Sequence, residues 1–410
     1  MPGPPASGHV SRPPVPFSTP RRAILRRARA RFPKAPPGRG GPTRASFGGR
    51  RNGEPRTTLC SHDAREVHMA RRPHSVLPLL ARQAAKVLGL AALGGSGAWL
   101  AYSRFAVDHR RPLPRALPGR LDALDTRAGA VALYGSAGGS GPPLLLIHSI
   151  NAAASAYEVR PLYLHYDGRC PVYALDLPGF GLSERARRRY TPDLMVEAIH
   201  AAAGEIRRRH DGAALNALAL SLSAEYLARA ALERPRDYRG LALISPTGFD
   251  ARLSGRSPRG GHRGRERLRA TLDAPPWGRA LFDALVSRPS MRFFLEKTWG
   301  SPDIDEGLLA YGYASAHRPG AQHAPFCFIA GHLFPTDATA LYEALDLPVL
   351  VIHGTRGDFV DYRDLPRFAE RRNWTVMRLP TGAFPHFEDL ATVTRALDGF
   401  GAAVTEVASA

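Results

Sequence analysis

Short, nearly continuous apolar segments alternate with amphipathic stretches over most of the chain after residue 120. We interpret the apolar segments as strands covered on both faces. They are Val131–Tyr134, Leu144–His148, Val172–Asp176, Leu215–Leu220, Leu241–Ser245, Val349–His353 and Thr375–Leu379. Helices are predicted at Pro192–Arg208, Glu225–Arg234, Leu365–Arg371 and Asp389–Phe400. This alternation predicts an α/β fold, a doubly wound and mostly parallel sheet.

The regular spacing of strands breaks between Ser245 and Leu347, and the intervening segment has helical patterns of its own. These lie around Trp277–Ser287, Met291–Trp299 and Asp305–Ala316. We therefore predict an α/β core over residues 121–250 and 336–405, with a helical cap over 251–335 above the carboxyl ends of the strands. The segment Arg252–Arg269, rich in Gly, Arg and Ser, is expected to be a mobile basic loop leading into the cap.

The net charge of +20 is unevenly distributed, because residues 1–68 hold 14 Lys and Arg against 3 Asp and Glu. This Pro-, Arg- and Gly-rich tail has no sustained apolar periodicity and is predicted to be disordered. It lacks interleaved aromatic residues and a recognition-helix pattern, so we expect no nucleic-acid partner despite a pI near 10.7. Two hypotheses remain for the tail: a genuine basic extension, or a segment outside the native coding sequence, with translation starting at Met69.

Residues 69–120 combine a hydrophobic segment with a basic linker. The run Val87–Tyr102 has 16 residues without charge and follows Arg82 and Lys86. A membrane-spanning helix needs about 20 apolar residues, so this run resembles a signal-peptide core or a single N-terminal anchor. We expect a membrane-associated or exported protein. The alternative is a cytoplasmic protein in which the run is a helix docked on the soluble domain.

The three cysteines, Cys60, Cys170 and Cys327, are widely spaced and odd in number. The sequence contains no C-x-x-C pair, so neither a disulfide framework nor a zinc site is predicted.

Ser221 stands between a predicted strand and a predicted helix, with the small residues Ala219 and Ser223 two positions before and after it. Small residues suit a turn at which strand and helix nearly touch. A serine at such a turn is exposed above the sheet, and a neighbouring backbone N–H can face a developing oxyanion. Ser221 is therefore a candidate nucleophile, although the usual G-x-S-x-G form has glycine at both flanking positions.

A serine nucleophile needs a base, and the base needs a carboxylate that orients it. In open α/β hydrolytic sheets the order along the chain is serine, acid, histidine. Asp358 follows the strand Val349–His353 in a turn, and His386 lies in the loop before the last predicted helix. Loops after parallel strands converge at one edge of the sheet. The weaker candidates are Asp361 and Asp346 for the acid, and His353, His323 and His332 for the base.

The loop His148–Asn151 follows another strand, and a backbone N–H there is a candidate oxyanion donor beside that of Leu222. The glycine-containing turn Asp176–Ser183 follows the next strand. Its glycines suit a tight turn bordering the site, and we expect a structural rather than a catalytic role for it.

Together these features resemble the α/β-hydrolase superfamily, in its single-domain type with a helical cap. The resemblance runs from about Val131 to Phe400. It rests on Leu146–His148, the turn Asp176–Ser183, Ser221, Asp358 and the segment Pro385–Glu388. It implies Ser221 as nucleophile, His386 as base, Asp358 as its orienting acid, and oxyanion donors from the backbone of Ile150 and Leu222.

The chain departs from the family pattern at three places. Ser149 follows His148 where glycine is common, Ala219 and Ser223 replace the glycines around Ser221, and the turn before Asp358 is one residue longer. A serine nucleophile also differs from the carboxylate of haloalkane dehalogenases and epoxide hydrolases.

We predict a serine hydrolase that cleaves an ester or related acyl bond through an acyl-enzyme, without a metal or organic cofactor. Hydrolysis of a carbon–carbon bond and acyl transfer use the same triad and remain alternatives, as does a weakly catalytic binding protein on this fold. The expected partner is a small, apolar acyl ester, and the oligomeric state is not predicted. Candidate pocket residues are His148, Ser149, Asn151, Trp277, Phe294 and Phe326.

Overall fold

A computed structural model describes residues 95–249, 260–357 and 361–409. Several predictions lie outside the described residues. They concern the tail 1–68 and Met69, residues 87–94 of the uncharged run, residues 252–259 of the basic loop, and Asp358.

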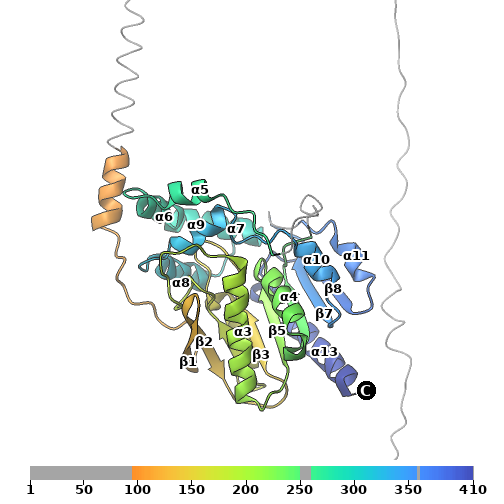
Figure 1. The fold of residues 1–410 in the computed structure, drawn as a ribbon. Helices are drawn as coiled ribbons and strands as arrows, with labels where there is room; N and C mark the ends of the chain where they lie inside the picture. The colour runs from red at the N-terminus through yellow and green to blue at the C-terminus, as the bar shows by residue number, and fades with distance from the viewer. Residues whose placement is uncertain (1–94, 250–259, 358–360, 410) are drawn as a thin grey trace, which may run out of the picture. The chain divides into compact units, whose positions relative to one another are not determined.

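One sheet of eight strands organises the described chain (Figure 1). Its strands are β1 (Arg120–Thr126), β2 (Gly129–Ser136), β3 (Leu144–Ile147), β4 (Val172–Leu175), β5 (Leu215–Leu220), β6 (Tyr238–Ile244), β7 (Val349–Gly354) and β8 (Trp374–Leu379). Their order is β1-β2-β4-β3-β5-β6-β7-β8. The pairs β1–β2 and β2–β4 are antiparallel and all others are parallel. The predicted doubly wound, mostly parallel sheet is confirmed.

Helices cover both faces of the sheet because side chains alternate across each strand. Leu145 and Ile147 of β3 point into the core shared with α3 (Pro192–Arg209) and α4 (Ser223–Glu233). Leu146 points into the opposite core, which contains side chains of α2 (Arg160–Tyr166) and α13 (Leu390–Ser409). The remaining elements of the core are η2 (Ala156–Val159), η3 (Pro235–Asp237), α10 (Ala338–Glu343), α11 (Leu365–Ala369) and α12 (Pro385–Glu388).

The sequence pattern does not reveal β1. Its residues, RLDALDT, are exposed or half-buried along its whole length. This strand forms the edge of the sheet, where charged residues discourage pairing with another chain. Because β1 is not buried, it has no apolar run that would predict a strand, although its seven residues pair in register with β2.

Residues 266–329, between β6 and β7, form a helical segment that we call the insertion. It consists of α5 (Glu266–Leu272), α6 (Gly278–Leu285), α7 (Arg288–Trp299), α8 (Glu306–Ala316) and α9 (His323–Ile329). The loop predicted over Arg252–Arg269 is wrong from Glu266 onward, because α5 begins there. Glu266 and Arg269 form an ion pair one turn apart on it.

The insertion packs on loops that follow several strands of the sheet. Tyr311 of α8 stacks on Tyr157 of η2, with ring centroids 4.9 Å apart. Trp299 at the end of α7 packs against Phe384 and Phe387, which follow β8. These loops leave the carboxyl ends of β3 and β8, so the insertion lies over the edge at which candidate catalytic residues gather.

Residues 95–105 form a helix that docks on the insertion (Figure 1). Trp99 Nε1 donates to the carbonyl of Ala280 at 2.8 Å, and the Ser103 hydroxyl donates to Asp283 at 2.6 Å. Asp283 is 2% exposed and also pairs with His109 and Arg279. Among the described residues, no helix combines the length and the apolar character needed to cross a membrane.

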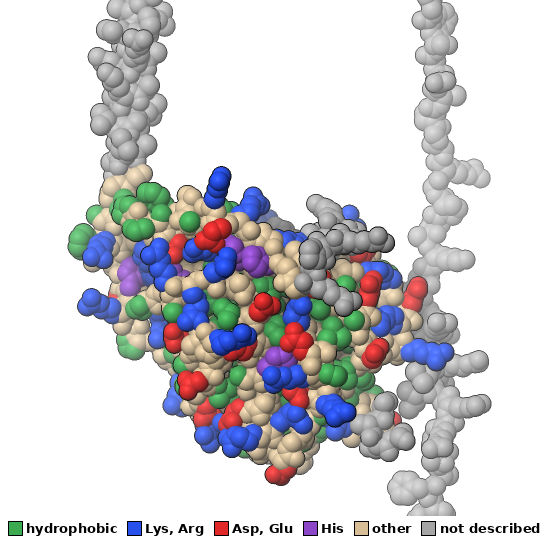
Figure 2. Space-filling model, viewed as in Figure 1, with side chains coloured by type: hydrophobic (Ala, Val, Ile, Leu, Met, Phe, Trp, Pro, Cys, Tyr) green, Lys and Arg blue, Asp and Glu red, His purple; other side chains and the backbone are tan. Residues whose placement is uncertain are grey.

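Basic and acidic side chains are intermixed over the face drawn in Figure 2. Elsewhere in the described chain, basic residues also form ion pairs, as Arg207 does with Asp237 and Arg209 with Asp122. Since residues 1–68 hold a net +11 of the +20, the basic character of the chain belongs more to its tail than to this surface.

Candidate active site

The chain turns sharply between β5 and α4, and Ser221 occupies that turn. Its φ is 50°, in the left-handed region that non-glycine residues seldom adopt. Its N–H donates to the carbonyl of Ile244 in the neighbouring strand at 2.9 Å, and its carbonyl accepts from Ala224 N–H at 3.1 Å. A left-handed residue costs about 1–2 kcal/mol, so the surrounding hydrogen bonds hold the serine in this conformation.

The small residues beside Ser221 are both buried. Ala219 pairs in register with Ile147 of β3, and a larger side chain would enter the packed core there. The Ser223 hydroxyl donates to the carbonyl of His148 at 2.6 Å. Ser223, which stands where the family pattern has glycine, thus ties the turn to the end of β3.

His148 has a structural place at the end of β3. Its Nδ1 donates to the carbonyl of Ser149 at 2.6 Å, and its Nε2 accepts the N–H of Leu177 at 2.9 Å. The ring is fully buried and lies edge-on to Phe180. Because both nitrogens are occupied by backbone groups, His148 positions the loop rather than offering a free polar atom to a ligand.

The loop after β3 carries the predicted oxyanion donor Ile150. Within the described residues, no hydrogen-bond acceptor is given for the N–H of Ile150 or of Leu222. The N–H of the preceding residue, Ser149, donates to the carboxylate of Glu158 at 2.8 Å, and Asn151 Nδ2 donates to the same carboxylate at 2.7 Å. The loop is therefore held by its polar neighbours while two backbone donors remain available.

His386 lies on the short helix α12, so the prediction that it belongs to a loop is wrong. Its side chain is fully buried, and its Nε2 donates to the carbonyl of Glu158 at 2.7 Å. Nδ1 has no partner in the described part of the chain. Burial lowers the pKa of this imidazole to about 4, against the hydrogen bond to Glu158, so the ring is neutral at physiological pH.

These contacts join the three predicted loops into one chain of hydrogen bonds. The Ser223 hydroxyl, two residues after Ser221, donates to the carbonyl of His148. The next residue, Ser149, donates its N–H to the Glu158 carboxylate, and the Glu158 carbonyl accepts from His386 Nε2. No hydrogen bond between the Ser221 hydroxyl and His386 is present among the described residues.

The turns after β7 and β8 lie side by side. The N–H groups of Thr355 and Arg356 both donate to the carbonyl of Thr381 at 3.0 Å. Arg356 pairs with Glu388 of α12, and Glu388 also accepts the N–H of Gly382 at 2.6 Å. Arg356 thus links the turn after β7 to the helix that carries His386.

The weaker candidates have other partners. Asp361 forms a bidentate pair with Arg363, and Asp346 is exposed beside β7. His353 donates to the carbonyl of Gly354 and lies against Tyr362, with ring centroids 4.1 Å apart. Its burial lowers its pKa.

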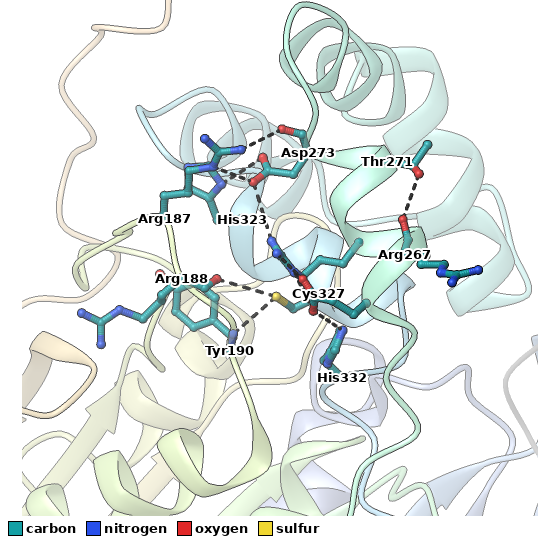
Figure 3. A network of polar contacts seen from close by, with 11 residues as sticks. Arg187, Arg188, Tyr190, Arg267, Thr271, Asp273, His323, Cys327 and His332 are labelled. Carbon is teal, nitrogen blue, oxygen red and sulfur yellow. Dashed lines mark hydrogen bonds and ion pairs between the residues drawn. The ribbon is translucent and has the colours of Figure 1, made fainter.

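The insertion is fastened to the core by the network in Figure 3. Arg187 and His323 converge on the carboxylate of Asp273, at 3.0 and 3.1 Å. The buried Cys327 accepts the N–H of Tyr190 at 3.3 Å. Burial raises the pKa of the Cys327 thiol, so the thiol stays protonated and serves packing rather than nucleophilic chemistry.

The predicted aromatic pocket residues occupy different environments. Phe326 is 1% exposed and packs edge-on to Phe282 inside the insertion. Trp277 and Phe294 are 47% and 46% exposed. The structure does not gather these three side chains around one cavity.

Comparison with known proteins identifies the family and the fold of this chain. The model of the Alpha/beta hydrolase family matches residues 144–396, which span β3 to the first turns of α13. The chain belongs to the alpha/beta hydrolase family. No curated protein sequence gives a match.

Solved structures of other alpha/beta hydrolases share the fold at low sequence identity. A serine hydrolase involved in carbazole degradation is 15% identical, with a TM-score of 0.53, covering 69% of this chain and 98% of its own. An esterase from Thermogutta terrifontis is 18% identical (TM-score 0.51; 70% and 99% covered). A membrane phospholipase A described as a bacterial virulence factor is 21% identical (TM-score 0.52; 80% and 97% covered).

Sequence reasoning missed two buried acids near this hydrolase's candidate nucleophile. Glu158 lies in η2, and no local pattern marks it in the sequence. Glu225 lies one turn after Ser221 and accepts a hydrogen bond from Thr247; burial raises the pKa of Glu225 to about 7. Only for Glu225 did the sequence give a sign of burial, in the apolar residues around it in α4.

Proposed function

We propose that this alpha/beta hydrolase is a serine hydrolase that cleaves an ester or related acyl bond. Ser221 is the nucleophile, His386 the base, and Asp358 the acid that orients the base. The strained conformation of Ser221 at the β5–α4 turn carries this proposal, because non-glycine residues in that region are held there only where the fold over-determines them.

In the first step His386 accepts the Ser221 proton while Oγ forms a bond to the carbonyl carbon. The N–H groups of Ile150 and Leu222 hold the resulting oxyanion. The imidazolium then returns the proton to the leaving alcohol as the C–O bond breaks. Water then takes the place of the alcohol: His386 accepts a proton from it as its oxygen bonds to the acyl carbon, and returns that proton to Ser221 as the acid leaves. No external cofactor is required.

The base must present an unprotonated nitrogen to Ser221. In the present rotamer Nε2 carries a proton, which it donates to the carbonyl of Glu158, so Nε2 cannot accept the Ser221 proton. A half-turn of the ring about Cβ–Cγ exchanges the places of Nε2 and Cε1. The carbonyl of Glu158 then faces the Cε1–H group. The ring proton must also move from Nε2 to Nδ1, where the orienting acid accepts its hydrogen bond, so that Nε2 is unprotonated and available as the base.

The substrate we propose is a small apolar acyl ester. The helical insertion acts as a cap, because it packs on loops that follow β3, β4 and β8. The esterase and the phospholipase among the structural neighbours support this class by analogy of fold. Carbon–carbon hydrolysis and acyl transfer use the same residues and are outcomes of the test.

Turnover of p-nitrophenyl esters with short, medium and long acyl chains tests the proposal. We expect hydrolysis that depends on chain length and disappears in Ser221→Ala. Hydrolysis by the variant at the wild-type rate would contradict it. No turnover together with no reaction toward a fluorophosphonate would favour the binding-protein alternative.

We also propose that the N-terminal segment is retained and associates the enzyme with a membrane. Trp99 and Ser103 hold the 95–105 helix to α6, and cleavage between them would remove part of that contact. Membrane fractions of cells expressing the chain from Met69 should retain uncleaved protein after a carbonate wash. A new N-terminus near residues 99–103 would indicate export, and uncleaved cytosolic protein would leave the docked helix as the function of this segment.

A further inference from the structure

The loop after β3 and the base His386 are both attached to one residue, Glu158. Its carboxylate accepts from Ser149 N–H at 2.8 Å and from Asn151 Nδ2 at 2.7 Å, and its carbonyl accepts from His386 Nε2 at 2.7 Å. The residue is 3% exposed. We propose that Glu158 is a positioning residue whose carboxylate fixes the oxyanion loop, next to the imidazole that its carbonyl contacts. This role rests on the proposed serine hydrolase function.

The orientation of the loop follows from these bonds. Because the N–H of Ser149 is directed at Glu158, it is withdrawn from the site, and the next N–H, that of Ile150, is left for an oxyanion. Asn151 is fixed at both ends of its amide, since its Oδ1 accepts Ala153 N–H at 2.8 Å while its Nδ2 reaches Glu158 and Ser149 Oγ. The serine that replaces the common glycine at position 149 thus takes part in the same network.

A carboxylate is required for this arrangement, because two donors converge on it. An ionised carboxylate accepts at both oxygens, whereas a glutamine accepts at one atom and donates at the other. Glu158→Gln would therefore direct an amide NH₂ at either Ser149 N–H or Asn151 Nδ2. One buried donor would lose its acceptor, and the loop would shift.

A swap of donor and acceptor tests this geometry. In the double variant Glu158→Gln/Asn151→Asp, the new glutamine donates to the new aspartate and the net charge is unchanged. Asn151→Asp alone directs two carboxylates at each other. Asp237→Asn is the matched control, since Asp237 is also buried and paired but precedes β6 at the opposite edge of the sheet.

We expect Glu158→Gln to lower kcat for a p-nitrophenyl ester about 10- to 100-fold with little change in KM, since a displaced oxyanion donor acts on the transition state. The double variant should recover at least about tenfold over either single variant, which is the coupling expected of directly contacting groups. Asp237→Asn should keep kcat within about twofold. An unchanged kcat in Glu158→Gln, or no recovery in the double variant, would overturn the proposal.

Amide hydrogen exchange of the segment after β3 provides a readout that does not require activity. Faster exchange there in Glu158→Gln and restored protection in the double variant are expected. If the wild-type protein neither turns over nor reacts with a fluorophosphonate, the proposed function fails, and exchange still decides whether Glu158 holds the loop. Unaltered exchange in Glu158→Gln would overturn the positioning role by itself.

Discussion

Two turns at the carboxyl edge of the sheet, after β4 and after β5, use similar residues in opposite ways. In the turn after β4, both oxygens of Asp176 accept backbone N–H groups, at 2.7 and 2.8 Å. The hydroxyl of Ser183 accepts a hydrogen bond from the N–H of Ala132. The turn after β5 has a strained Ser221, and the nearby His386 has a ring nitrogen without a partner in the described residues.

The difference separates scaffold from candidate chemistry. In the β4 turn, positive φ falls on glycines, Gly179 and Gly181, which adopt it at no steric cost. In the β5 turn a serine adopts it. Strain at a serine between a strand and a helix is a reason to propose a function for that turn, whereas a fully bonded turn is explained by stability alone.

The largest predicted effect concerns the two serines. Ser221→Ala should lower ester turnover by several orders of magnitude, up to about 10⁶-fold, because triad members act as a unit. Ser183→Ala should leave kcat nearly unchanged and lower the free energy of unfolding by about 1–3 kcal/mol, since it leaves a buried N–H unpaired. Steady-state kinetics and urea unfolding of both variants measure the two effects. A large loss of kcat in Ser183→Ala, rather than in Ser221→Ala, would contradict the comparison.

The identity of the acid gives the next effect. Asp358→Asn should reduce kcat by about 10⁴-fold, as in triads that lose the orienting carboxylate. Asp361→Asn should have a small effect, because Asp361 pairs with Arg363. Steady-state kinetics decide between them, and the reverse order of effects would move the acid to Asp361.

The third prediction concerns pH. Burial lowers the pKa of His386 from its ordinary 6.5 to about 4. Below about pH 6.5 the unfolded chain binds a proton that the native state does not, so stability is full above that pH and declines toward pH 4. The total is on the order of 3 kcal/mol.

Urea unfolding of wild type and His386→Gln across this range isolates the contribution from those of other buried histidines, such as His353. The difference between the two proteins should shrink as the pH falls. A difference independent of pH would show that His386 has an ordinary pKa.

The smallest effect tests the role of glycine in the β4 turn. Gly181 has a φ of 50°, and a Cβ there would lie 2.0 Å from the Asp176 carboxylate. Gly181→Ala should cost at least about 2 kcal/mol of unfolding free energy. Gly204→Ala in α3, where a Cβ meets open space, should stabilise by about 0.5–1 kcal/mol. Equal Tm changes for the two variants would contradict this account.

The sequence predicted the parts of the fold that depend on apolar periodicity. All seven predicted strands are present. Six of them are largely buried, so their apolar pattern reports that burial directly, whereas β8 is exposed or half-buried over most of its length. The sequence pattern missed β1, whose exposed edge carries no apolar run, and the short helix under His386, which has too few residues to show a period.

For the candidate site, the pattern placed Ser221 and His386 after β5 and β8, where the structure has them, but could not indicate Glu158. Its role depends on three contacts with residues 7 to 228 positions away, one of them through a backbone carbonyl. The docking of 95–105 on α6 likewise depends on contacts about 180 residues apart.

Peptide mapping after reaction with a fluorophosphonate tests the central claim most directly. A nucleophilic serine with a base nearby forms a stable phosphonyl adduct, whereas an ordinary serine does not react. We predict a single adduct on Ser221 that is absent from Ser221→Ala and from protein unfolded in urea. An adduct on another serine, or none on folded wild-type protein, would contradict the assignment of Ser221 as the nucleophile.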